Sequence, residues 1–258
     1  MGRTLRYSIS ILFLFIGSSF LAYAQDTIPI TLKIKIGIEA SGPMIYYADK
    51  KILNTEGYIS VDLNEKRSAT IAAGFLRYKF SQYNYQYLNN GSYIKAGMEF
   101  NFLKPDKAQG KYFIGVGLRY GLSRFSSETP SFEITNYWGT TTSSLPVRNY
   151  WGHFLELAPG VRAEVLKNFT LGWSINIRKL IYTSTGNDLK PVYFPGYGDG
   201  SKSITAGLSY YIVWNIPYRK IKAIIRKDVP EEKDDTKDTG TGTQNTNSNS
   251  QQGSTIRQ

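Results

Sequence analysis

The chain has 258 residues, a formal net charge of +11 and no cysteine. The lack of cysteine excludes a disulfide framework, a thiolate site and the lipid-bearing cysteine of a bacterial lipoprotein. A basic chain can bind nucleic acid, but an exported protein rarely meets any, so we expect no nucleic-acid partner. The 20 tyrosines and 4 tryptophans are typical of the aromatic belts of a membrane barrel.

Residues 1–24 are predicted to be a secretory signal peptide. Arg3 and Arg6 form a basic start, Ile9–Phe20 is a short apolar run, and Ala22-Tyr23-Ala24 matches an A-x-A cleavage site. We expect cleavage after Ala24. An uncleaved anchor is the alternative, which the small-residue site and the short run disfavour. No other segment of the sequence resembles an apolar transmembrane helix, so a membrane-spanning chain has to be a barrel.

Eight segments alternate apolar and polar side chains with the period of two that β-strands require. Each holds about ten residues, which is the length that crosses a bilayer at a tilt. In chain order they are Ile30–Ala40, Gly57–Asn64, Ala69–Phe80, Tyr93–Phe102, Lys111–Ser123, Phe154–Val165, Phe169–Ile177 and Ser203–Ile216.

The connections between these segments alternate in length. Three are short and four are long: Asn64–Ser68, Lys104–Gly110 and Leu166–Asn168 against Gly42–Glu56, Ser81–Ser92, Ser126–Tyr150 and Tyr182–Lys202. Short periplasmic turns and long outer loops are typical of outer-membrane barrels, and an even strand number leaves both termini in the periplasm. The triplet Phe132-Glu133-Ile134 in one long loop could extend its flanking strands beyond the membrane.

The apolar face of the strands is predicted to contact lipid, although a soluble lipocalin-like barrel would turn that face inward. The polar faces are rich in small residues such as Gly115 and Gly160, which suits a narrow lumen. The last strand carries Thr205-x-Gly207-x-x-Tyr210-x-Ile212, which resembles the signal by which outer-membrane barrels are recognised for insertion. The chain departs from that pattern because it continues to Gln258 instead of ending on an aromatic residue.

Charged side chains of both signs lie on the predicted polar faces. We expect a structural lumen network of Glu99, Arg119, Glu156, Arg162, Glu164 and Arg178. Such residues can neutralise one another across a lumen, where an unpaired charge is costly. Eight strands leave an interior that side chains just fill, so we predict a closed lumen, with a narrow channel as an alternative.

The sequence offers no catalytic, cofactor or metal site, so we expect the protein not to be an enzyme. Its one histidine, His153, has Trp151 and Leu155 as same-face neighbours and no adjacent nucleophile, which favours an aromatic-belt position. One histidine without cysteine is a poor metal site, and the glycines follow strand alternation instead of a phosphate-binding turn. An outer-membrane enzyme acting on lipid A or phospholipid acyl chains is the alternative.

The presumed outer loops are crowded with aromatic residues, namely Tyr83, Tyr85, Tyr87, Tyr137, Trp138, Tyr193, Phe194 and Tyr197. These rings either contact glycans or partner proteins, or they pack over the barrel mouth. We therefore expect a structural or interaction role in the cell envelope. The expected partners are outer-membrane lipid, lipopolysaccharide and an envelope protein.

Residues 25–218 form the predicted barrel, and residues 219–258 differ from it in composition. A basic cluster that includes Arg219 and Lys227 is followed by acidic and then Thr/Asn/Ser/Gln/Gly-rich sequence. Such a tail has too few apolar residues to fold, so we predict disorder. The basic cluster could rest on phospholipid headgroups, with a solvated charge run as the alternative.

Six short motifs mark the barrel region: Ser41-Gly42-Pro43, Gly91-Ser92-Tyr93, Gly117-Leu118-Arg119-Tyr120-Gly121, His153-x-x-Glu156-Leu157, Gly160-Val161-Arg162-Ala163-Glu164-Val165 and Pro195-Gly196-Tyr197. Together they resemble a Bacteroidetes family of predicted outer-membrane β-barrel proteins of unknown function, from Ile30 to Pro217. The resemblance implies the outer membrane and an eight-stranded antiparallel up-and-down transmembrane barrel. That family carries no established activity, so the resemblance implies no functional residue.

Overall fold

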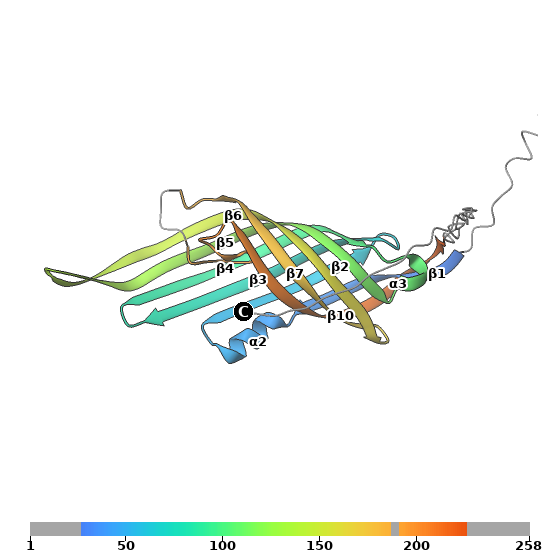
Figure 1. Cartoon of the computed structure of the whole chain (residues 1–258), viewed down its shortest axis with the longest axis horizontal. Helices are drawn as coiled ribbons and strands as arrows, with labels where there is room; N and C mark the ends of the chain where they lie inside the picture. The colour runs from blue at the N-terminus through green and yellow to red at the C-terminus, as the bar shows by residue number, and fades with distance from the viewer. Residues whose placement is uncertain (1–26, 187–190, 226–258) are drawn as a thin grey trace, which may run out of the picture. The chain divides into compact units, whose positions relative to one another are not determined.

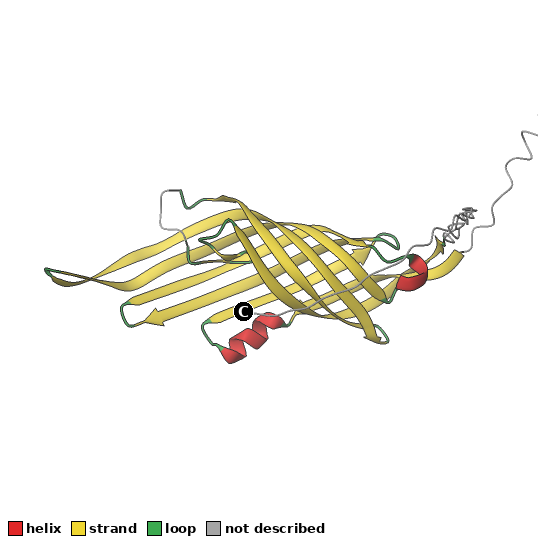
Figure 2. Cartoon of the chain, in the orientation of Figure 1, coloured by secondary structure: helices red, strands yellow, loops and turns green. Residues whose placement is uncertain are grey.

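The computed structural model describes residues 27–186 and 191–225. The predicted signal peptide, its cleavage site and residues 226–258 of the predicted tail lie outside the described residues. Residues 219–224, which were assigned to the tail, belong to β10 and pair with β1. Figure 2 shows that strands dominate the described part and that two short helices lie in connections between strands. The predicted all-β class is confirmed.

Eight of the described strands close into a barrel (Figure 1). They are β1 (Thr27–Glu39), β2 (Ile52–Asp62), β3 (Arg67–Gln82), β4 (Tyr85–Asn101), β5 (Tyr112–Asn136), β6 (Gly139–Leu166), β7 (Phe169–Thr183) and β10 (Ile204–Ile224). Each barrel strand pairs antiparallel with its neighbours in the chain, and β10 returns to pair with β1. The described barrel is therefore the antiparallel up-and-down ring of eight strands that the alternation predicted.

Several strands are longer than the alternation indicated. β3 and β4 meet at Gln82 and Tyr85, so most of the predicted loop Ser81–Ser92 is a paired hairpin. β5 and β6 extend to Asn136 and Gly139, in line with the extension that was foreseen there. Backbone hydrogen bonds can continue a ladder whatever the side chains are, so polar or aromatic extensions escape a pattern based on hydrophobicity.

Two helices occupy connections that were expected to be irregular. α2 (Ser41–Ala48) follows β1 at the end of the barrel that carries the long connections. α3 (Pro105–Ala108) forms the turn between β4 and β5, and the left-handed residues Gln109 and Gly110 end it. In the connection between β7 and β10, β8 (Tyr193–Phe194) pairs with β9 (Gly198–Asp199). None of the described helices has the length and apolar character needed to span a membrane.

The two faces of the barrel wall differ sharply in chemistry. The outward side chains are exposed and apolar, including Ile38, Ile59, Ile71, Ile94, Leu118, Leu157, Trp173, Ile175, Leu208 and Trp214. The inward side chains are buried and largely polar or charged, including Ser60, Thr70, Lys95, Glu99, Glu156, Asn176, Ser209 and Asn215. A water-soluble protein usually shows the opposite arrangement, with apolar side chains buried and charged side chains exposed.

One part of the face prediction is wrong. The alternation in Ile30–Ala40 puts Ile30 and Leu32 on the same apolar face as Ile36 and Ile38, which was expected to contact lipid. In the structure Ile30 and Leu32 are only 4% and 3% exposed. The pairing of β1 with β10 shifts register between Leu32 and Lys33, which interrupts the strict alternation. The turn after α3 also covers this end of β1, because Gly110 lies against Ile30.

Candidate functional site

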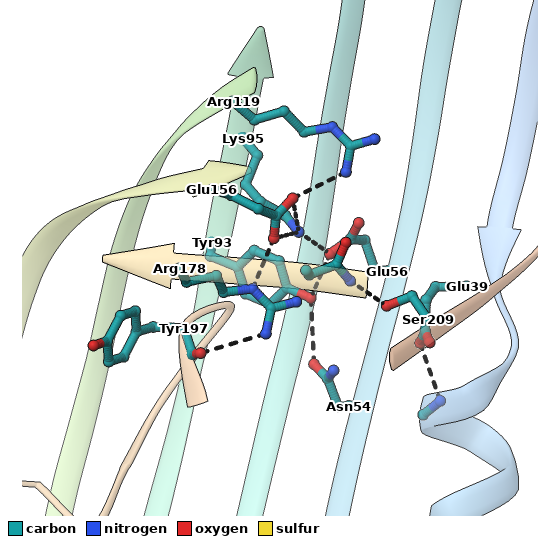
Figure 3. Close-up of polar contacts among 12 residues, drawn as sticks. Glu39, Asn54, Glu56, Tyr93, Lys95, Arg119, Glu156, Arg178, Tyr197 and Ser209 are labelled. Carbon is teal, nitrogen blue, oxygen red and sulfur yellow. Dashed lines mark hydrogen bonds and ion pairs between the residues drawn. The ribbon is translucent and has the colours of Figure 1, made fainter. Parts of the chain in front are cut away.

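A fully buried carboxylate, that of Glu156 on β6, lies inside the barrel. Three cations converge on it (Figure 3): Lys95 Nζ lies 3.1 Å from Oε2, Arg119 donates to Oε1 at 2.9 Å, and Arg178 donates to Oε2 at 2.7 Å. Glu156 is 0% exposed. Its donors come from β4, β5 and β7, so this carboxylate ties together four consecutive strands of the ring.

Two further carboxylates complete the network. Glu99 accepts a hydrogen bond from Arg119 at 2.7 Å and is also ion-paired with Arg162. Glu56 pairs with Lys95 at 2.6 Å. We refer to the resulting set as the charged cluster: Glu56, Lys95, Glu99, Arg119, Glu156, Arg162 and Arg178. Because Lys95 and Arg119 each bridge two carboxylates, the cluster is one connected network.

The structure brings together five of the residues that were predicted to form a lumen network and places Glu164 elsewhere. Glu164 pairs with Lys33 of β1 and accepts the backbone N–H of Asn168 at 2.8 Å. The same end of the barrel holds Asp62, whose carboxylate pairs with Lys35. Glu164 therefore belongs to a second group of ion pairs, near the turn that joins β6 and β7.

Lys95 and Glu56 are the members of the charged cluster that the predicted set omits. Lys95 follows the polar alternation of β4, on the face of Tyr93 and Glu99, so the sequence did contain a signal for it. Glu56 fell in a connection that was expected to be a loop, and β2 in fact begins at Ile52. Glu56 lies directly opposite buried Glu39 on β1, so Lys95 stabilises a place where two carboxylates face each other.

Aromatic rings fill the interior next to the charged cluster. Tyr58 and Tyr211 meet edge to face with ring centroids 5.3 Å apart, and both are buried. The guanidinium of Arg162 lies over the ring of Phe113, 4.1 Å from its centroid. Such contacts favour a cation that is removed from water. The interior is thus occupied by interlocking charged and aromatic side chains.

The connection between β7 and β10 forms a lid on one mouth of the barrel. Phe194 and Tyr197 insert into a buried aromatic group with Phe125, Tyr150 and Phe154. The backbone oxygen of Tyr197 accepts hydrogen bonds from Thr205 at 2.6 Å and from Arg178 at 3.4 Å, which links the lid to the charged cluster (Figure 3). We call residues 191–203 the lid.

Local turn chemistry shapes the lid. Gly196 has a φ of +74°, and a Cβ there would lie 2.6 Å from the Tyr93 ring, so only glycine fits without movement. At the following turn, hydrogen bonds from Ser201 hold the pKa of the Asp199 carboxyl below its usual value. Among the aromatic residues of the predicted loops, Tyr87, Phe194 and Tyr197 are buried, whereas Tyr83, Tyr137 and Trp138 at the hairpin tips are exposed.

His153 lies on the outer surface among aromatic rings. Its Nδ1 is 2.6 Å from the Tyr120 hydroxyl, and its ring contacts Trp151 and Tyr182. This is the aromatic environment that was expected, with the Tyr120 hydroxyl as a hydrogen-bond partner of the imidazole. In residues 27–186 and 191–225, no group of three or more His, Cys, Asp or Glu side chains is placed to hold a metal ion.

Comparisons with known proteins give a family and a set of distant structural likenesses. A profile of the family described as "Domain of unknown function (DUF6048)" matches residues 4–221. No curated protein matches the chain. Ail, the attachment invasion locus protein of Yersinia pestis, is similar at 9% identity and a TM-score of 0.37, over 75% of this chain and 100% of that one.

Two further solved structures match with similarly low identity and a similarly low TM-score. The N-terminal β-barrel domain of Pseudomonas aeruginosa OprF is 10% identical with a TM-score of 0.31, over 73% of this chain and 100% of that one. Acinetobacter baumannii CarO is 12% identical with a TM-score of 0.29, over 74% of this chain and 98% of that one.

Proposed function

The chain belongs to the family described as domain of unknown function DUF6048, and we propose that it is an outer-membrane β-barrel with a structural or interaction role in the cell envelope. The observation that carries this proposal is the inverted wall, with charges buried inside and apolar side chains exposed outside. On β7, Trp173 and Ile175 are 46% and 45% exposed, whereas Ser174 and Asn176, which alternate with them along the strand, are buried. Covering such side chains with lipid removes the unfavourable contact with water.

The ends of the barrel support an orientation. Thr27 of β1 pairs with Ile224 of β10, so both ends of the described barrel lie together. The short turns that join β2 to β3, β4 to β5 and β6 to β7 lie at this same end, which we assign to the periplasm. The β5–β6 tip, α2 and the lid then belong to the outer surface.

We propose that the lumen is closed to solutes. The charged cluster spans the interior from β2 to β7, and the lid packs Phe194 and Tyr197 into the outer mouth. Opening a path would require separating the ion pairs that Glu156 forms with Lys95 and Arg119, which link β4, β5 and β6 inside the lumen. A closed lumen supports a role on the membrane surface instead of diffusion. The exposed rings of Tyr137 and Trp138 are where an envelope protein would bind.

We propose further that the role is not catalytic, since the only histidine of the sequence, His153, contacts aromatic rings on the lipid-facing side. An H153A variant should leave the acylation profile of the outer-membrane lipids unchanged. A changed profile would favour the alternative, an enzyme acting on acyl chains.

Envelope fractionation with electrophoretic mobility tests the proposal. We expect the protein in the outer-membrane fraction, and a folded barrel that migrates faster before boiling than after. Recovery from the periplasm without detergent would refute the membrane assignment.

Discrete conductance steps in a planar bilayer would refute the closed lumen. Copurification after mild detergent extraction would then identify the envelope partner that Tyr137 and Trp138 are proposed to bind.

A further inference from the structure

α2 exposes an unusual number of apolar side chains for a short helix. Met44 and Tyr47 are 65% and 87% exposed, and Ile45 is exposed as well. The start of the helix is fixed to the barrel wall, because Ala40 N–H donates to the Tyr210 oxygen at 2.8 Å. Figure 1 shows α2 beside the barrel wall, at the end that we assign to the outer surface. The helix thus adds apolar surface above the outward side chains of β1 and β10.

Three basic side chains lie on the outward face of the barrel wall near the end of α2: Lys51 follows Ala48 by three residues, and Arg77 and Lys79 lie on β3, the strand that pairs with β2. Arg77 and Lys79 continue the outward face of β3 beyond Phe75, and the side chains of Phe75, Arg77 and Lys79 are all exposed. The N–H of Lys79 donates to the oxygen of Lys51 at 2.8 Å, so these two lysines lie opposite each other. Arg77 faces Leu53, two residues further along β2. Opposite Cβ atoms in such pairs are about 5 Å apart and diagonal neighbours about 7–8 Å, so the three cations form one patch.

Almost no acidic charge balances this patch. Lys51 has one carboxylate within reach, Asp49 at 3.9 Å, and both side chains are more than half exposed. In the described part of the chain, no carboxylate forms an ion pair with Arg77 or Lys79. Like charges directly opposite each other destabilise a sheet. An anion between Lys51, Arg77 and Lys79 would remove that repulsion.

We propose that α2 lies in the outer leaflet and that Lys51, Arg77 and Lys79 bind the phosphate of an anionic lipid. This inference rests on the proposed membrane location and assigns a lipid class to one side of the barrel. The apolar side chains of α2 contact the acyl chains, and the basic patch meets the headgroup at the boundary with water. Basic side chains next to an apolar surface fit a phosphorylated lipid better than a soluble anion, which would contact the cations alone.

Lipid selectivity measured by electron paramagnetic resonance tests the headgroup site. The full chain would be reconstituted in phosphatidylcholine vesicles that contain spin-labelled phosphatidic acid or spin-labelled phosphatidylcholine, and the motionally restricted fraction measured for each. One basic side chain at a membrane surface favours an anionic lipid by about fivefold, so we expect at least this preference in the wild type. The K51Q/R77Q/K79Q variant should lose most of it. The matched control R67Q/K107Q/K111Q removes the same charge at the opposite end and should retain it.

Equal preference in the wild type and in K51Q/R77Q/K79Q would overturn the site, as would an equal loss in both triple variants. A second measurement tests α2 directly. Because the sequence has no cysteine, an environment-sensitive dye can be placed at Y47C alone, with Y83C on the β3–β4 turn as its control. We expect a blue-shifted emission at position 47 only, and identical emission at both positions would overturn the placement of α2. Failure of the wild type to enter vesicles would instead refute the proposed function.

Discussion

Neutralising Glu156 should destabilise the barrel more than any other single loss of charge. The E156Q substitution keeps the shape of the side chain but leaves Lys95, Arg119 and Arg178 facing an amide. Removing one partner of a buried ion pair costs about 3–5 kcal/mol, because the remaining charge stays away from water. Lys95 and Arg119 keep second carboxylates in Glu56 and Glu99, whereas Arg178 keeps only weak contacts. We therefore expect a loss of about 3–4 kcal/mol.

Urea titration of folding into vesicles, followed by tryptophan fluorescence, measures this loss. The double variant E156Q/R178Q removes the cation that loses most and should recover about half of the stability, because it restores the charge balance. E133Q on the exposed end of β5 is the matched control and should change stability by less than about 0.5 kcal/mol. A loss below about 1 kcal/mol in E156Q would show that the interior is hydrated, and it would refute the closed lumen.

Three further perturbations test separate parts of the barrel. W173R places a charge on the lipid-facing side of β7 and should cost about 2–4 kcal/mol in vesicles, whereas the apolar replacement W173L should cost less; equal losses in the two variants would contradict the face assignment. Y197A removes a fully buried ring and should expose the lid to protease while the barrel stays folded, and an unchanged cleavage pattern would show that the lid is not held by that ring. G97A should lower the urea midpoint more than G117A, since the new Cβ would lie 2.0 Å from a backbone oxygen in the first case and 3.5 Å from a side chain in the second.

Strand number, order and side-chain faces could be predicted because both faces of this wall are chemically uniform. On β10, Leu208 and Trp214 are exposed and Ser209 and Asn215 are buried, as the alternation requires. Lipid outside and paired charges inside impose the same period of two on every strand. The prediction failed at Ile30 and Leu32, where a register shift and a covering turn change the environment of β1 without any change in hydrophobicity.

The charged cluster was only partly predictable for a related reason. Alternation says which side chains face inward, and it therefore indicated Glu99, Arg119 and Glu156. It does not give the height of a residue along the barrel axis, because strand tilt and stagger offset the levels of neighbouring strands. Glu164 shares a face with Glu156 but lies near the next turn, where it pairs with Lys33. The extent of β2, and with it Glu56, depended on pairing with β1 and β3.

Single-cysteine accessibility along β7 tests the closed, lipid-embedded barrel most directly. Each variant of the cysteine-free chain would be folded into vesicles and treated with a charged, water-soluble thiol reagent. We predict no reaction at Ser174 or Asn176, because the lumen is closed, and none at Trp173 or Ile175, because lipid covers them, whereas Tyr137 at the β5–β6 tip reacts fully. Reaction at position 174 or 176 would show that the lumen is open. Reaction at position 173 or 175 would show that the outer face of the barrel is in water.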